Sequence, residues 1–368
     1  MKQLSIFCAV LLAVFALAAP AAAFTADDVS GEMDGDCVYT LYAEDGTLLT
    51  MRAARMYEDD EYIAGDDKHY RITRVDDDAC EAYAAYIGMA YESAGAWEDE
   101  AAHAEDENVT RRIGMYSTHS DESYVEGDGE SSKLENAGIY DVGNALKESL
   151  EQKGVDVDYS EETFHPHDAG AYSRSRSTAE DLIKQSPDAL FDVHRDAIPA
   201  SHYETEVDGE EISKVRLFVG RRNPNSESNM AFAKQIKRAA DEMHPGLIKD
   251  IYIGKGNYNQ ELYPRALLLE MGTHVIDKEL VLKSTDYLAD VVDRVLYGET
   301  AQAAERDEVG QESNAGAWKG ILWVVGIAVV AALVYAFVST GSGRGMWDKF
   351  KRSASELTGG SVGKRNRK

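Results

Sequence analysis

The stretch that decides the fold is Ala189-Leu-Phe-Asp-Val-His-Arg-Asp196. A short, mostly apolar run of this kind predicts a buried strand of the type found in parallel sheets. The predicted strand delivers an imidazole, His194, and then two charged side chains, Arg195 and Asp196, at its carboxyl end. In open α/β sheets ligands bind beyond the carboxyl ends of the strands, so we expect a functional site at this end.

Two other segments have the same pattern. Arg112-Ile-Gly-Met-Tyr-Ser-Thr-His119 lies upstream, and Arg265-Ala-Leu-Leu-Leu-Glu270 lies downstream. Three strands that each end in His or Glu can bring these groups together at one edge of a sheet. Two imidazoles, a nearby carboxylate and a further Glu are the side chains of a hydrolytic zinc site. The sequence therefore predicts a zinc-dependent hydrolase.

The predicted metal ligands are His119, Glu122 and His194. Zinc in hydrolases binds three N or O donors and leaves a fourth position for water, and Glu122 follows His119 by three residues. Asp141 or Glu135, near the start of the next predicted helix, are alternatives to Glu122. A pair of buried, hydrogen-bonded histidines without metal is the alternative for the two imidazoles.

Glu270 is the predicted catalytic residue. A carboxyl at the end of an apolar strand has a raised pKa, which suits it to take a proton from water and to pass it to a leaving amine. The alternative is a structural carboxylate that pairs with Arg195 or Arg265.

Other polar residues around these strands are candidates for substrate contacts. Arg174, Arg176 and Arg195 are expected to bind carboxylates of a peptide substrate, and solvated charges are the alternative. The segment 165–168, His-Pro-His-Asp, is interpreted as a substrate-facing or structural loop rather than a metal cluster. The loop 254–260 lacks the spacing of a phosphate-binding loop and is interpreted as a flexible wall of the cleft.

Residues 111–298 alternate predicted strands and helices. Helices are expected over 136–154, from a capping box at Ser177, over 226–243 and from Ser284. This alternation predicts an α/β domain with a mainly parallel sheet that helices cover on both faces.

Residues 24–92 predict a small β-rich module. Its strands alternate with period two around a turn at Asp45-Gly46, and we expect no catalytic group in it. An acidic, aliphatic-poor linker follows at 93–110. Cys37 and Cys80 form a disulfide or remain two buried thiols.

The two ends of the chain predict membrane targeting. Residues 1–23 have the pattern of a secretory signal. After a polar tether at 299–317, the segment 318–339 predicts a transmembrane helix, because its apolar part roughly matches the ~30 Å hydrocarbon core. The tail 340–368 is basic, which predicts a cytoplasmic location for it and an extracytoplasmic location for the catalytic domain of a single-pass cell-membrane protein.

The chain of 368 residues has 66 acidic and 38 basic residues and a formal net charge of −28. Because several of the basic residues lie in the tail, the external part is still more acidic. This charge argues against nucleic acid or anionic lipid as a partner of that part.

Several stretches together resemble the stage II sporulation protein P family. The resemblance covers about residues 110 to 298, and its motifs occur in the same order as in the family. These motifs are Tyr116-Ser-Thr-His-Ser-Asp-Glu-Ser-Tyr124, His167-Asp-Ala-Gly-Ala-Tyr-Ser-Arg-Ser-Arg176, Phe191-Asp-Val-His-Arg-Asp196, Val219-Gly-Arg-Arg-Asn-Pro-Asn225, Gly256-Asn-Tyr-Asn-Gln-Glu-Leu262 and Arg265-Ala-Leu-Leu-Leu-Glu270.

The resemblance implies a fold and an activity. Members are similar to zinc-dependent N-acetylmuramoyl-L-alanine amidases with a phosphorylase/hydrolase-like α/β sandwich, and they degrade peptidoglycan during engulfment by amidase and endopeptidase cleavage. The resemblance implies His119 and His194 as zinc ligands and Glu270 as the catalytic carboxylate. It also implies a membrane-bound lytic transglycosylase and other engulfment proteins as partners. The chain departs from the family in its anchor, which is usually an N-terminal helix.

The predicted reaction is hydrolysis of the amide between N-acetylmuramic acid and L-alanine of the stem peptide. Zinc is expected to activate water and polarise the carbonyl while Glu270 acts as general base and then acid. A peptidoglycan endopeptidase or carboxypeptidase with the same zinc site is the first alternative. A non-catalytic wall-binding module is the second.

Overall fold

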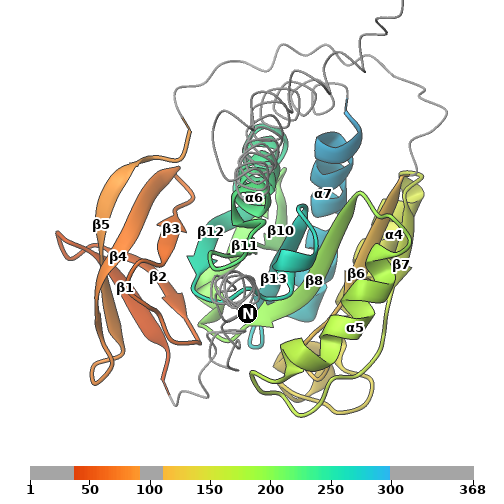
Figure 1. The fold of residues 1–368 in the computed structure, drawn as a ribbon, viewed down its shortest axis with the longest axis horizontal. Coiled ribbons are helices and arrows are strands. Elements are labelled where there is room, and N and C mark those ends of the chain that lie inside the picture. The colour runs from red at the N-terminus through yellow and green to blue at the C-terminus, as the bar shows by residue number, and fades with distance from the viewer. Residues whose placement is uncertain (1–36, 92–110, 299–368) are drawn as a thin grey trace, which may run out of the picture. The chain divides into compact units, whose positions relative to one another are not determined.

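The computed structural model describes residues 37–91 and 111–298. Its strands are β1 (Tyr39–Ala43), β2 (Leu48–Arg52), β3 (Glu61–Ile63), β4 (Lys68–Asp76), β5 (Glu81–Met89), β6 (Arg112–Tyr116), β7 (Asp156–Tyr159), β8 (Ala189–Asp196), β9 (Glu204–Val207), β10 (Glu210–Ser213), β11 (Val215–Gly220), β12 (Ile248–Gly254) and β13 (Ala266–Thr273). An 11-stranded sheet has the order β2-β1-β5-β4-β3-β12-β11-β13-β8-β6-β7, and β9 pairs separately with β10 (Figure 1).

Strands β13, β8 and β6 are neighbours in the sheet and run in the same direction. Their register places Glu270 opposite His194 and Tyr116 opposite Asp192. The carboxyl ends of the three strands therefore meet at one edge of the sheet, as the sequence predicts.

Strand β11 departs from this common direction. It is parallel to β12 but antiparallel to β13. At the end of the sheet, β6 and β7 are parallel to each other. The strands of 111–298 in the large sheet are thus mainly parallel, as expected. The complete sheet is mixed, because antiparallel pairs also join β1 to β2, β3 to β4, β4 to β5 and β3 to β12. The fold is a mixed α/β fold with one large sheet.

The helices are α3 (Val125–Asp128), α4 (Gly138–Gln152), α5 (Ala171–Ile183), α6 (Ser226–Met243) and α7 (Lys278–Tyr297), with short 3-10 helices η1 (Ala200–His202) and η2 (Gln260–Leu262). Leu190 packs with Ala179 and Leu182 of α5, whereas Phe191 belongs to the core that contains the buried side chains of α4, α6 and α7. Because successive strand residues point to opposite faces, helices cover both faces of the sheet.

Two helices begin earlier than the sequence predicts, whereas α6 has the predicted bounds. Helix α5 begins at Ala171, so Ser177 lies in its interior and does not cap it. Helix α7 is capped by Asp277, whose side chain accepts a backbone N–H at 3.0 Å. Ser284 instead donates to a backbone carbonyl one turn earlier, which is a common use of Ser inside a helix.

The N-terminal strands are β-rich as predicted, and the turn at Asp45-Gly46 joins β1 to β2. They do not form a separate module, however. Strand β3 pairs with β12, with Ile63 opposite Ile251, and all described residues belong to one compact unit. The expected division between 24–92 and 111–298 is therefore corrected. Pairing between the edges of two distant segments leaves no signal in the period-two pattern of either.

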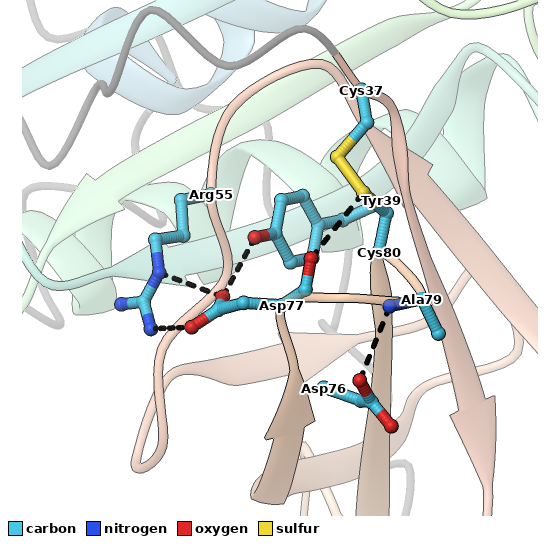
Figure 2. The surroundings of a disulfide bond; sticks show 7 residues. All are labelled: Cys37, Tyr39, Arg55, Asp76, Asp77, Ala79 and Cys80. Atoms are coloured by element: carbon cyan, nitrogen blue, oxygen red, sulfur yellow. Dashed lines mark hydrogen bonds and ion pairs between the residues drawn. A yellow bond between two sulfur atoms is a disulfide. The ribbon is translucent and has the colours of Figure 1, made fainter.

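Cys37 and Cys80 form a disulfide across a sequence separation of 43 residues. The bond ties the residues before β1 to the turn between β4 and β5 (Figure 2). Beside it, Asp77 accepts hydrogen bonds from the Tyr39 hydroxyl at 2.7 Å and from Arg55 Nε at 2.9 Å. Of the two alternatives for these cysteines, the structure shows the disulfide.

The predicted signal at 1–23, linker at 93–110, tether at 299–317, transmembrane segment at 318–339 and tail at 340–368 lie outside the described residues. Among the helices of 37–91 and 111–298, none has the length and apolar character that a membrane span requires.

Candidate active site

The shared carboxyl edge of β6, β8 and β13 carries the predicted site residues. His119 follows β6, His194 lies in β8 and Glu270 lies in β13. Parallel pairing and register fix their relative positions, because each side chain is attached to, or immediately follows, a buried strand. His119 and His194 are 3% and 2% exposed, respectively.

Three buried side chains at this edge can share one metal ion. His119, Glu122 and His194 each offer a ligand atom, and these atoms lie within 4.8 Å of one another. His119 Nδ1 is 3.6 Å from Glu122 Oε1, and His194 Nδ1 is 3.6 Å from Glu122 Oε2. These distances exceed hydrogen-bond lengths. They agree with the separation of about 3.4 Å between two donors that each bind a tetrahedral zinc ion. The residues have the donor types that zinc prefers, and their donor atoms, within 4.8 Å of one another, are close enough to approach one ion.

Glu122 is the carboxylate that the structure brings to the two imidazoles. The backbone N–H of Arg195 donates to Glu122 Oε2 at 2.9 Å, which holds the carboxylate in place. Asp141 is exposed and pairs with Lys278 at 2.7 Å, and Glu135 is also exposed. Neither alternative belongs to the group of potential ligands.

A second carboxylate, Asp192, lies behind His194. Its Oδ1 atom is 2.9 Å from His194 Nε2, the ring nitrogen that faces away from Glu122. Asp192 also accepts hydrogen bonds from the backbone and the hydroxyl of Thr118, at 2.8 and 2.6 Å. A carboxylate beside the distal nitrogen is common at metal-binding imidazoles, although His194 Nε2 itself has no hydrogen-bond partner among the described residues. Asp192 was not predicted, although it lies two residues before His194 and therefore on the same face of the strand.

Neighbouring charges lower the pKa of Glu122 and raise that of His194. Burial alone would raise the pKa of Glu122, but the positive charges of His194 and Arg195 hold it well below its usual range. Burial would lower the pKa of His194, but Asp192 and Glu122 raise it well above its usual value. The metal-free site thus favours an imidazolium, and metal binding must release its proton.

Glu270 has the environment that was predicted for a general base. Its Oε2 atom is shielded from solvent and has no hydrogen-bond partner among the described residues. Burial raises the pKa of Glu270 to about 8, Asp196 adds to the rise, and the charge of His194 opposes it. Arg195, a predicted alternative partner, instead donates to the carbonyls of Ser123 and Ser131 at 3.2 and 2.8 Å.

A cavity of about 250 Å³ opens beside these groups. Its wall contains the three potential ligands and Glu270, together with residues from several other segments of the chain. These other residues are Arg52, Ala53, Ala54, His167, Asp168, Arg195, Asp196, Ala197, Arg216 and Phe218.

The 165–168 segment lies beside the potential metal ligands, as a substrate-facing or structural loop would. His167 and Asp168 line the cavity. The His167 ring stacks on His119 with 4.0 Å between centroids, and its Nδ1 atom is 2.9 Å from Asp121 Oδ1. His165 Nε2 is 3.2 Å from the Leu134 carbonyl. The structure does not group these histidines with the potential ligands.

The three predicted substrate-binding arginines have different positions. Arg195 lines the cavity, whereas Arg174 and Arg176 do not. Arg174 donates to the Phe164 carbonyl at 2.8 Å and to Asp168 at 2.6 Å, so it holds the loop that carries His167. Arg176 pairs with residues of the same unit, among them Glu180 at 3.1 Å.

The loop 254–260 is not a flexible wall of the cleft, and that interpretation is corrected. Its residues 257–260 are buried, and none of the seven lines the cavity. The Gln260 side chain accepts from the Gly220 backbone at 2.8 Å and donates to the Phe218 carbonyl at 2.9 Å. A polar loop can thus be buried when its side chains satisfy backbone groups.

Two cavity residues, Arg52 and Arg216, were not predicted. Arg216 is 1% exposed and donates to Asp250 at 2.7 Å and to Asp196 at 2.9 Å. A signal was present in the sequence, because an arginine inside the apolar strand 215–220 needs buried partners. Arg52 lies in β2, in the part of the chain where no functional group was expected.

Fold and site define an α/β protein with a candidate divalent-metal site and a buried carboxylate in one cavity. The chain belongs to the stage II sporulation protein P family, because the model of that family matches residues 56–293. The resemblance stated from the sequence motifs is thereby confirmed.

A curated relative is stage II sporulation protein P of Bacillus subtilis (strain 168), with 25% identity over 202 residues. The match covers 50% of each chain, so this chain spans about half the length of that relative. Similar solved structures include the apo form of the N-acetylmuramyl-L-alanine amidase Ami1 from Mycobacterium abscessus, at 14% identity and a TM-score of 0.33, covering 50% of this chain and 94% of that one. Another is the CwlD amidase from Clostridioides difficile in complex with the GerS lipoprotein, at 13% identity and a TM-score of 0.33, with the same coverage.

Proposed function

We propose that this protein is a zinc-dependent peptidoglycan hydrolase that cleaves the amide between N-acetylmuramic acid and L-alanine of the stem peptide. The observation that carries the proposal is the convergence of donor atoms from His119, Glu122 and His194 within 4.8 Å, in the cavity that Glu270 also lines. Family membership supports septal wall thinning or engulfment during sporulation as its setting.

The residues of the cavity divide the chemistry among them. A zinc ion held by His119, Glu122 and His194 would supply a Lewis acid that polarises the scissile carbonyl and lowers the pKa of water. Glu270 takes a proton from the attacking water and delivers it to the leaving amine, and its raised pKa suits both steps. Asp192, 2.9 Å from the other ring nitrogen of His194, supplies a negative charge beside this imidazole.

The remaining predictions complete the proposal. The catalytic domain acts outside the cytoplasm on a membrane-anchored chain, with the 318–339 helix as anchor. The partners are peptidoglycan itself and, by family resemblance, a membrane-bound lytic transglycosylase and other engulfment proteins. The net charge of −28 supports the exclusion of nucleic acid.

Digestion of purified sacculi by the full chain tests the proposal. We expect the zinc-loaded protein to release stem peptides that begin with a free L-alanine amino group. Chelation should abolish the release, because it removes the Lewis acid. The substitution Glu270→Ala should lower the rate by about 10²–10⁴-fold, the usual contribution of a general base. Arg71→Gln is a matched control, because Arg71 is half-exposed, pairs with Glu61 and does not line the cavity. Equal release by native, chelated and Glu270→Ala protein would overturn the proposal.

Mass spectrometry of the products separates the alternatives. Cleavage only within the peptide would show an endopeptidase or carboxypeptidase that uses the same zinc site. Metal-independent binding to sacculi without any cleavage would show a wall-binding module.

A further inference from the structure

The imidazole of His167 stacks on the potential metal ligand His119. The two ring centroids are 4.0 Å apart, and the ring planes differ by 24°. The His167 side chain is 39% exposed, whereas that of His119 is 3% exposed. His167 lines the cavity but does not belong to the group of potential ligands. His167 therefore contacts a potential ligand without being one itself.

Asp121 holds the His167 ring in this position. Its Oδ1 atom lies 2.9 Å from His167 Nδ1. Its other carboxylate oxygen accepts a hydrogen bond from Ser132, and its backbone carbonyl accepts one from the N–H of Lys133 at 2.8 Å. Asp121 is also 4% exposed. Because the residue is buried and both carboxylate oxygens have partners, Asp121 is a fixed hydrogen-bond partner for the imidazole.

Helix α5 holds the loop that carries His167. Arg174 of this helix donates to the Phe164 carbonyl at 2.8 Å and to the Asp168 side chain at 2.6 Å. These two partners lie on either side of His167 in the chain. The loop therefore cannot carry His167 away from His119 without breaking these bonds.

Two further rings border His119. Tyr172 meets it edge to face, with centroids 5.5 Å apart and planes at 69°, and His194 does so at 4.9 Å and 79°. The contact with His167 is different, because the two rings are nearly parallel. A rotation of the His119 ring about its Cβ–Cγ bond would push the ring edge into His167, since stacked rings are already in van der Waals contact.

The orientation of the His119 ring matters for metal binding. In this orientation its Nδ1 atom lies 3.6 Å from Glu122 Oε1. A ring that is already held in its binding orientation loses less conformational freedom when the metal binds, so the affinity rises. We propose that His167 and Asp121 are positioning residues for His119. His167 holds the His119 ring by stacking on it, and Asp121 holds the His167 ring. The inference rests on the proposed function, because it assigns residues that support the proposed metal site.

The zinc affinity of the full chain, measured by competition with a chromophoric chelator, tests this role. We expect His167→Ala to weaken zinc binding by about 10- to 100-fold, the usual effect of losing a residue that supports a metal ligand. His167→Phe should retain most of the affinity, because phenylalanine keeps the flat ring and loses only the bond to Asp121. His69→Ala is a matched control and should leave the affinity unchanged, because His69 pairs with Glu61 and does not line the cavity.

A double-mutant cycle tests whether Asp121 acts through His167. Asp121→Ala should weaken zinc binding more in the wild type than in the His167→Phe background, where the bond between the two side chains is already absent. Equal losses in both backgrounds would show that Asp121 does not act through His167.

Cobalt(II) substitution adds a measurement that a loss of stability alone would not change. The visible absorption of cobalt depends on the geometry of its ligands, so His167→Ala should shift the bands, whereas His167→Phe and His69→Ala should not. If His167→Ala fails to fold, His167→Leu takes its place. Leucine keeps most of the side-chain volume but has no ring to stack, so it should show the same loss of zinc affinity.

The outcomes separate this inference from the hydrolase proposal. Unchanged zinc affinity in His167→Ala and His167→Leu, or a loss in His167→Phe as large as theirs, would overturn the inference while the proposed function stands. A chain that shows the expected differences in zinc affinity but cleaves no peptidoglycan would keep the inference and refute the proposed reaction. A wild type that binds no zinc would overturn both.

Discussion

Glu270 stands among acidic neighbours in a shielded position. Asp196 and Glu122 raise its pKa in addition to burial, so the ionised form of Glu270 is costly in the metal-free protein. A bound divalent cation would remove much of this cost. The carboxylate is thus suited to a catalytic role and unfavourable for the stability of the metal-free protein.

Glu270→Gln should therefore stabilise the metal-free protein at high pH. With a folded-state pKa of about 8 against a lower one in the unfolded chain, the folded state binds more protons between these values, so its stability falls as pH rises through this range. At pH 8 we expect the variant to gain on the order of a few kcal/mol in the free energy of unfolding, and the gain should disappear near pH 4. Urea unfolding in the presence of a chelator measures it. A gain that is the same at both pH values would contradict the assigned environment.

The sequence predicts the site residues that end buried strands and not those that reach the site from elsewhere. His119, His194 and Glu270 were identifiable, because parallel strands bring their carboxyl ends to one edge. Glu122 followed from its spacing to His119. Arg52 carries no comparable signal, because its position depends on how β2 lies against a distant part of the chain.

At the scale of elements, strand β11 provides a buried side chain that bonds both to the N-terminal strands and to the strands of 111–298. Its Arg216 lies between Asp250 of β12 and Asp196 of β8, and it also reaches Thr50 of β2. Burial favours the neutral form of Asp250, but Arg216 and Lys249 hold its pKa well below the usual range. Arg216 therefore bonds to two buried carboxylates beside the candidate active site, and together with Lys249 it keeps that of Asp250 ionised.

Arg216→Met should lower the free energy of unfolding by about 3–5 kcal/mol, because it leaves buried carboxylates without their partner. Arg71→Met, at a half-exposed position in the same large sheet, should change it by no more than about 0.5 kcal/mol. Guanidinium chloride unfolding compares the two. A loss below about 1 kcal/mol for Arg216→Met would show that the cluster does not hold these strands together.

Element boundaries followed the sequence for α6, whose bounds are those predicted. They failed at α5 and α7, where Ser177 and Ser284 suggested caps but lie inside longer helices. The prediction that these segments form strands was correct for β1 and β2. Their place in the sheet was not predictable, because the β3–β12 pairing depends on backbone hydrogen bonds that are the same for any side chains.

At the scale of the molecule, the described residues form one unit because the sheet continues from β2 to β7. The Cys37–Cys80 disulfide closes a loop within the N-terminal strands, and those strands share buried contacts with the cavity. A change in the stability of the N-terminal strands should therefore change the free energy of unfolding of the whole unit.

The double substitution Cys37→Ser and Cys80→Ser should lower the free energy of unfolding by about 3–4 kcal/mol, as expected for a loop of this length. Circular dichroism and tyrosine fluorescence should still report a single transition at one denaturant midpoint. A reducing agent should have no further effect on this variant. Two separate transitions, with only the first one shifted, would show that the N-terminal strands fold independently.

The central claim is that His119, Glu122 and His194 bind one divalent ion beside Glu270. Metal analysis combined with X-ray absorption spectroscopy of the zinc-loaded full chain tests it most directly. We predict one zinc per chain with two imidazole ligands and otherwise oxygen ligands, loss of this zinc in His194→Ala, and unchanged zinc content in Glu270→Gln. A protein that binds no zinc, or a zinc environment that is the same in the wild type and in His194→Ala, would contradict the account.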